Sequence, residues 1–188
     1  MPRVGLSREK LVATAMAIAD EHGLSAVTMH SLARIYNVAA PSMYKHVKNL
    51  HDLHSAIASE ALILFERALR AGEPDGVIEI ATAYRKFAQE HPGLYEATQK
   101  PQLFTDETSL AASHRIIALI ASTLPDSLSP HDVVNQVRIV RSLLHGFVAL
   151  EQTGGFGLPE SVDSSFQQLC TTLNLINSLA GVTTSPTT

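Results

Sequence analysis

Residues 38–53, VAAPSMYKHVKNLHDL, concentrate positive and aromatic side chains in a chain that is slightly acidic as a whole. Four of these side chains can contact DNA phosphates, namely Tyr44, Lys45, His46 and Lys48. The amides near Thr28, at a helix N-terminus, can do the same. Ser42 can hydrogen-bond a base edge, Ala40 and Pro41 can meet thymine methyl groups, and Lys45 can reach guanine. The alternative is an ordinary surface turn with solvated lysines.

Signals for catalysis or metal binding are weak. No His, Cys or carboxylate set shows zinc spacing such as H-E-x-x-H, so we expect His145 to be a partly buried histidine without a metal. The segments GLSREK and TGGFG lack the G-K-[ST] ending of a phosphate loop. No serine has a convincing His and Asp constellation. We therefore expect no enzyme activity, no metal and no cofactor.

Composition indicates a globular cytoplasmic protein. The chain has 188 residues, 45% of them hydrophobic, and the single cysteine Cys170 gives no disulfide framework. There is no apolar signal region at the N-terminus and no run long enough for a membrane span. Up to residue 56 there are six Lys/Arg against four acids, whereas the remainder carries eight against fourteen. Contact with a polyanion therefore belongs to the N-terminal third.

The N-terminal third is predicted to form three helices. Ser7 can cap a helix over residues 8–22, and Gly23 occupies the place of a left-handed stop. Thr28 can cap a second, short helix, and Asn37 tolerates the left-handed turn that follows. A third short helix starts near Pro41 and ends before residue 49. Residues 1–48 are thus predicted to form a helix-turn-helix DNA-binding domain.

The rest of the chain is also predicted to be helical, which makes the protein all-α with about nine helices. Asn49 and Asp52 resemble a capping box and open a long helix to about residue 71. Further helices are expected at about 75–90, 92–99, 106–124, 130–152 and 160–180. Residues 49–182 would form an effector-binding and dimerisation domain, and residues 183–188 a flexible tail.

Residues 8–55 resemble the TetR family of bacterial transcriptional regulators. The segment DEHGLSAVTMHSLARIYNVAAPSMYKHVKNLHDL follows the family order of an E-x-G turn, a T-x-x-x-[IL]-A helix, a turn and a helix closing in Y-x-[HYF]-[FV]. Tyr36 and Asn37 replace the usual alanine and glycine, and Ala39 replaces the usual polar cap. The resemblance implies that Tyr44, His46 and Lys48 contact the DNA backbone.

The second domain resembles one subfamily of these regulators, marked by Y-x-x-F-A-x-x-H-P-x-x-Y and a later H-G pair. The matching segments are AYRKFAQEHPGLYEA at 83–97 and LLHGFVALEQTGGF at 143–156. The subfamily usually has a tryptophan four residues before the histidine of H-G. Arg141 stands there in this chain, which implies a more polar pocket than usual. Gly146, inside a helix, indicates close helix packing.

Two functions of the second domain follow as expectations. Long apolar stripes on the last two helices predict a symmetric four-helix dimer interface, the alternative being internal core; they comprise Val133, Val137, Val140, Leu144, Phe166, Leu169, Leu173 and Ile176. A mostly apolar effector pocket is implied by the resemblance, although each aromatic residue could equally be plain core; its candidate residues are Tyr84, Phe87, Tyr95, Gln99, Phe104 and His145.

Two functional hypotheses remain from the sequence. The first is a homodimeric repressor that binds a palindromic double-stranded DNA operator and is released by a small-molecule effector. The second is a helical small-molecule-binding or enzyme-like protein that has lost DNA recognition. The basic helix-turn-helix favours the first, while Asn37, Ala39 and the modest charge leave room for the second.

Overall fold

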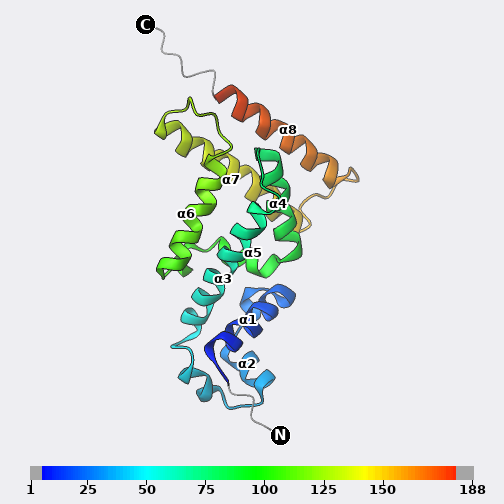
Figure 1. Cartoon of the computed structure of the whole chain (residues 1–188). Coiled ribbons are helices and arrows are strands. Elements are labelled where there is room, and N and C mark those ends of the chain that lie inside the picture. Colours follow the sequence, from blue (N-terminus) through cyan, green and yellow to red (C-terminus); the bar gives the residue numbers. More distant parts are fainter. Residues whose placement is uncertain (1–5, 181–188) are drawn as a thin grey trace. The chain divides into compact units, whose positions relative to one another are not determined.

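The computed structural model describes residues 6–180, and these are helical without a β-strand (Figure 1). The elements are α1 (Arg8–His22), η1 (Leu24–Ala26), α2 (Met29–Tyr36), η2 (Ala40–Lys45), α3 (Leu50–Arg70), α4 (Val77–Glu90), α5 (Pro92–Thr98), η3 (Pro101–Leu103), α6 (Glu107–Ala121), α7 (Pro130–Gln152) and α8 (Val162–Ala180). The all-α prediction is confirmed, and the expected helices agree with the observed α-helices to within a few residues. The predicted tail lies outside the described residues.

The described residues divide into two compact units. The first contains residues 6–65 and 90–112, and the second contains residues 66–89 and 113–180. Helix α3 therefore contributes to both. The described part of the expected DNA-binding segment lies wholly within the first unit, while the functional boundary at residue 48 stays a prediction.

Local signals in the first unit act largely as predicted. Ser7 caps α1 by accepting a hydrogen bond from the Lys10 amide at 3.4 Å, and Asn37 ends α2 in the left-handed conformation with φ 50° and ψ 49°. Gly23 has φ 84° but ψ 156°, so it ends α1 in a region open essentially to glycine alone rather than in the left-handed helical region.

The third short helix predicted near Pro41 is present in a tight form. Residues 40–45 form a 3-10 helix, in which Ser42 N donates to Ala39 O at 2.9 Å and His46 N donates to Met43 O at 2.9 Å. Ala39 offers no side-chain acceptor for the free amides of the first turn, so no cap favours an α-helical start here.

The expected capping box at α3 is only half formed. Asn49 Oδ1 accepts from the Asp52 amide at 2.8 Å, as a cap does. The Asp52 carboxylate does not return to Asn49; it accepts from the Lys48 amide at 2.8 Å. Asp52 thus holds the backbone that precedes the helix.

The core of the first unit joins the two short elements to α1 and α3. Its largest buried side chains include Leu11, Leu24, Leu32, Met43, Leu53, Ile57 and Tyr95. Met43 is the one buried residue of η2, and Val47 follows it into the core four residues later. These two side chains fix which face of residues 40–48 is presented to solvent.

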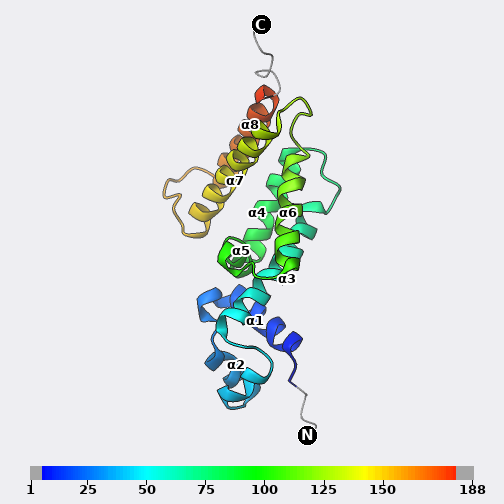
Figure 2. The same ribbon diagram turned by 90° about the vertical axis from the view of Figure 1, so that its left-hand side faces the viewer.

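In the second unit, α7 and α8 form an antiparallel hairpin (Figure 2). Five of the eight residues predicted to form a dimer interface are buried in the chain's own core: Val137, Val140, Leu144, Phe166 and Leu173. Burial in the chain's own core leaves these five side chains little surface for a second copy. Val133, Leu169 and Ile176 are half-buried. No atom lies within 4 Å of a Cβ built on Gly146, so the described chain lacks the close packing expected there.

Residues 6–180 contain neither a membrane-spanning helix nor a cluster of metal-ligating side chains. None of the helices described there is long and apolar enough to cross a membrane. Within the same range, no group of three His, Cys, Asp or Glu side chains is arranged to hold a metal ion.

Candidate nucleic-acid interface

Residues 40–48, which we call the recognition segment, present a consistent outer face. Met43 and Val47 are buried, whereas Tyr44 is 53% exposed. Among the predicted DNA-binding residues, Pro41, Lys45 and Lys48 are exposed, and Ala40, Ser42 and His46 are half-buried. Two buried anchors thus hold a row of phenol, ammonium and hydroxyl groups toward solvent. Such groups contact phosphates and base edges.

Thr28 begins α2 in a reciprocal capping box. Its Oγ1 accepts from the Ser31 amide at 2.9 Å, and Ser31 Oγ accepts from the Thr28 amide at 2.9 Å. Ser31 Oγ also donates to the carbonyls of Ala26 and Thr28. The helix N-terminus is therefore rigidly placed, and its dipole favours an anion such as a phosphate.

Tyr36, one of the departures from the family pattern, joins α2 to α1. Its hydroxyl lies 2.7 Å from Thr14 Oγ1 and donates to the Lys10 carbonyl at 2.9 Å. An alanine at this position could not make either contact. The residue that departs from the pattern thus adds a tie between the first two helices.

The recognition segment is held at its far end by Arg8, a residue that the sequence did not single out. The guanidinium donates to Asp52 at 2.8 and 2.9 Å and to the His46 carbonyl at 3.3 Å. Hydrogen bonding from Arg8 holds the pKa of Asp52 at about 2, well below its ordinary value. With the Lys48 amide also on Asp52, we call this group the Arg8–Asp52 clamp.

Positive charge on the exposed side of the helix-turn-helix comes from three residues. Arg34, Lys45 and Lys48 are exposed and form no salt bridge among residues 6–180. Arg34 lines a groove of about 610 Å³ together with His30, Asn37, Val38 and Ala40, the first residue of the recognition segment. The sequence analysis did not single out Arg34, because its exposure depends on which side of α2 packs inward.

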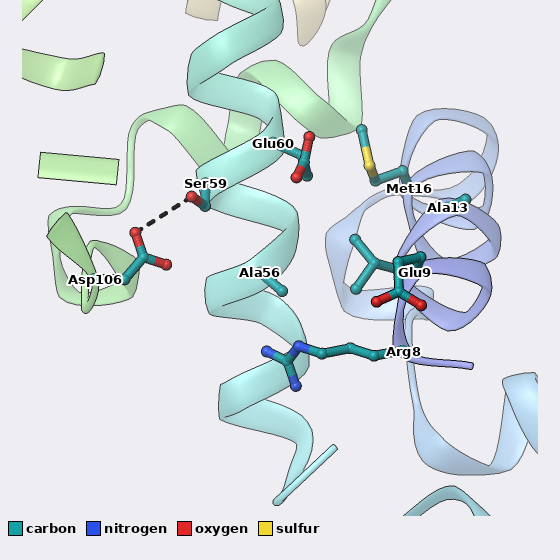
Figure 3. A pocket seen from close by; sticks show the side chains of 9 residues that line it. Arg8, Glu9, Ala13, Met16, Ala56, Ser59, Glu60 and Asp106 are labelled. Atoms are coloured by element: carbon teal, nitrogen blue, oxygen red, sulfur yellow. Dashed lines mark hydrogen bonds between the residues drawn. The ribbon is translucent and has the colours of Figure 1, made fainter. Parts of the chain in front are cut away.

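A cleft of about 470 Å³ between α1 and α3 has a different character. Figure 3 shows Arg8 and Glu9 on α1 opposite Ala56 and Glu60 on α3. Ser59 donates to Asp106 at 3.3 Å at its edge. Three carboxylates line the cleft, and its one cation, Arg8, is neutralised by Asp52. Phosphates are therefore repelled from this cleft.

The H-P-x-x-Y segment, residues 91–95, makes structural contacts within the first unit. Asp20 of α1 pairs with the His91 ring at 2.7 Å and accepts from the Leu94 amide at 3.0 Å. A Cβ on Gly93 would lie 1.8 Å from the Ala19 carbonyl oxygen, so only glycine permits this approach. Glu96 accepts from the Leu24 amide at 3.2 Å. The segment therefore anchors α5 on the end of α1.

The predicted effector-pocket residues are divided between the two units. Tyr95 is buried edge-on to Phe65, while Gln99 and Phe104 are half-buried in the first unit. In the second unit Tyr84 and Phe87 are buried, whereas His145 is exposed. Partial desolvation of the ring, assisted by Arg141, lowers the pKa of His145. That these six residues share one pocket stays a prediction.

Comparison with known proteins identifies the family. Residues 77–173 match the family described as tetracyclin repressor-like, C-terminal domain. The chain is 31% identical over 169 residues to the uncharacterized HTH-type transcriptional regulator YobS of Bacillus subtilis, covering 86% of this chain and 87% of that protein. It is 33% identical over 159 residues to the uncharacterized HTH-type regulator Rv0681 of Mycobacterium tuberculosis, covering 79% and 72%.

The chain is also similar to a regulator whose structure was solved in complex with DNA. The crystal structure of BioQ with its double-stranded DNA operator matches with a TM-score of 0.65 and 25% identity, covering 91% of this chain and 99% of that one. The helix-turn-helix geometry, the matched C-terminal family and the two regulators agree with one another. This chain is therefore a member of the TetR family of helix-turn-helix transcriptional regulators.

Proposed function

We propose that the protein is a homodimeric repressor that binds a palindromic operator through the recognition segment and is released from it by a small-molecule effector. The carrying observation is the orientation of this segment: Met43 and Val47 are buried, while Pro41, Tyr44, Lys45 and Lys48 are exposed. A segment held in this way presents the same side chains to every duplex that it meets. The relative solved with its operator supports DNA as the partner.

Roles within the segment follow from chemistry. Tyr44, Lys45 and Lys48 would contact phosphates, with Thr28 at the α2 N-terminus, and these contacts set affinity rather than sequence. Ser42 would hydrogen-bond a base edge, and Ala40 with Pro41 would meet thymine methyl groups. We add Arg34 as a phosphate contact, because it is an exposed cation beside the start of the recognition segment.

The dimer would use the apolar side chains that the α7–α8 hairpin leaves outside. They include Ile139, Leu150, Leu175 and Leu179, all exposed in the chain by itself. Gly146 lies on α7 between the first two, and its missing side chain would permit close approach of a second copy. A two-fold dimer would present two recognition segments to half-sites one or more DNA turns apart, about 34 Å for one turn.

The operator is tested by selecting random duplexes with the purified protein and following the affinity of the winners against salt. We expect a palindromic consensus bound about 10³-fold or more tightly than random DNA, with a steep salt dependence. Ser42→Ala should change the preferred DNA sequence, while Lys48→Ala should weaken binding to all duplexes by the same factor. Enrichment of no sequence in the presence or absence of candidate effectors would contradict the proposal.

The dimer is tested by sedimentation of two double variants. Leu175→Asp with Leu179→Asp places charges on the proposed interface and should yield monomers. Asn174→Asp with Ser178→Asp adds the same charges one residue earlier on α8, at exposed positions outside that apolar row, and should leave the dimer intact. Identical behaviour of the two variants would contradict this interface.

Effector release is tested by titrating candidate ligands against the operator complex. His145→Ala should alter the response to an effector without changing affinity for operator DNA, since it lies outside the recognition segment. A loss of DNA affinity in the absence of ligand would contradict this role.

A further inference from the structure

The second unit contains an arginine in an unusual setting. Arg85 of α4 has a side chain only 12% exposed, and its guanidinium lies 4.6 Å from the centre of the Phe166 ring and 5.7 Å from that of Phe147. Phe147 also packs against Phe156, with ring centres 4.8 Å apart. A cation stacked on aromatic faces in this way is largely removed from water, which strengthens its attraction for anions.

Two carboxylates meet Arg85, and they differ in how firmly they are held. Glu151 takes hydrogen bonds from both Nε and Nη2, with Nε 2.9 Å from Oε2, and also accepts from Gln89 Nε2 at 3.1 Å. Asp163 meets Nη2 at 2.7 Å, from a side chain that is 78% exposed. Glu151 is therefore a fixed partner. Asp163 is an exchangeable one, since an exposed ion pair contributes little to stability.

Arg85 opens on a groove of about 550 Å³ between α4 and α8. Ile78, Phe166 and Cys170 give the groove an apolar wall, and Thr82 and Thr171 give it hydroxyl groups. Lys86 adds a second positive side chain to the lining, against the single carboxylate of Asp163. The volume suits a small organic molecule, and none of the six predicted effector-pocket residues lines it.

We infer that this groove binds an amphipathic organic acid, a molecule with one carboxylate and an apolar body. The ligand carboxylate takes the place of Asp163 on Arg85, forming a charge-assisted hydrogen bond in a partly enclosed site. The apolar body lies against Ile78, Phe166 and Cys170. A neutral ligand of the same shape gains the apolar contact but cannot replace Asp163. The use of this groove as an effector site rests on the proposed repressor function, whereas the binding does not.

The first test compares octanoate, 1-octanol and octylamine as probes of the full-length protein by calorimetry, without DNA. Octanoate should bind at least tenfold more tightly than either other probe. Asp163→Asn removes the competing charge, so it should strengthen octanoate binding about threefold to tenfold and leave 1-octanol unchanged. Equal affinity for octanoate and 1-octanol, or no effect of Asp163→Asn on octanoate, would overturn the inference.

A matched pair of α8 variants locates the site. Thr171 and Thr172 are both exposed, and each hydroxyl donates to the carbonyl four residues earlier, at 3.0 and 2.9 Å. Only Thr171 lines the groove. Thr171→Phe should fill it and weaken octanoate binding at least tenfold, while Thr172→Phe should bind as the wild type does, with both folded by circular dichroism. Equal effects of the two changes would overturn the location. Because DNA is absent, failure here leaves the operator result untouched.

Discussion

Arg8 in the first unit and Arg85 in the second each hold a carboxylate with two guanidinium nitrogens, but in different surroundings. Arg8 and Asp52 are 42% and 22% exposed, and their pair fixes the backbone at His46 and Lys48. Arg85 and Glu151 are 12% and 18% exposed, and the Arg85 guanidinium lies over the rings of Phe147 and Phe166. The same kind of ion pair thus fixes the backbone at residues 46–48 in the first unit and lies within the packed helices of the second.

The largest effect on stability should come from breaking the ion pair between Arg85 and Glu151. Arg85→Ala leaves Glu151 without its cation and removes the stacking on Phe166, so we expect a loss of about 3 kcal/mol in the free energy of unfolding. Urea denaturation measures it, with Arg138→Ala, an exposed arginine on α7, as the control expected within about 0.5 kcal/mol of wild type. A loss of less than about 1 kcal/mol in Arg85→Ala would remove the contrast between the two pairs.

The Arg8–Asp52 clamp should matter less for stability and more for DNA. Asp52→Asn keeps an acceptor for the Lys48 amide but removes the charge that holds Arg8. We expect a loss of about 1–2 kcal/mol in stability and about tenfold in operator affinity, because the recognition segment becomes less well positioned.

The salt dependence separates positioning from direct contact. Asp52→Asn should leave the slope of log affinity against log salt unchanged, since no phosphate contact is lost. Lys48→Ala should weaken binding and reduce that slope by about one. A reduced slope in Asp52→Asn would mean that the clamp works by supplying charge to the DNA rather than by fixing the backbone.

These two networks also mark the limit of what could be predicted from the sequence. Thr28, Asn37 and the start of α3 at Asn49 follow rules that act over a few residues, and each could be placed in advance. The partners Arg8 and Asp52 are 44 residues apart, and Arg85 and Glu151 are 66 apart, so nothing local indicates their pairing.

The dimer stripe predicted from the sequence meets a related limit. Val137, Val140 and Leu144 show the same helical spacing whether they face the chain's own α8 or a second copy. Only the packing of the hairpin reveals that the exposed residues lie beside the stripe rather than on it. Residues 40–45 likewise form a 3-10 helix without a side-chain cap at Ala39, and the sequence predicted a short helix there without its type.

The pH dependence of stability sharpens the comparison further. The pKa of Asp52 is about 2 in the folded protein and ordinarily 3.8, so the stabilisation is fully present above about pH 4 and is lost as the pH falls toward 2. Wild type should therefore lose about 1–2 kcal/mol more than Asp52→Asn between pH 4 and pH 2, after allowance for the exposure of Arg8. Parallel curves for the two proteins over this range would place the low pKa in doubt.

The smallest effect on stability should come from removing the neutral hydrogen bonds of Tyr36. Tyr36→Phe keeps the ring but removes the hydroxyl that bonds Thr14 and the Lys10 carbonyl, so we expect a loss of about 1 kcal/mol in the free energy of unfolding. No charge is involved, so the curve of stability against pH should shift downward without changing shape between pH 4 and pH 2. Operator affinity should fall by less than in Asp52→Asn, because Tyr36 joins α2 to α1 and does not touch the backbone of residues 46–48. A larger loss of affinity than in Asp52→Asn would show that the orientation of α2, rather than the clamp, limits how the recognition segment meets DNA.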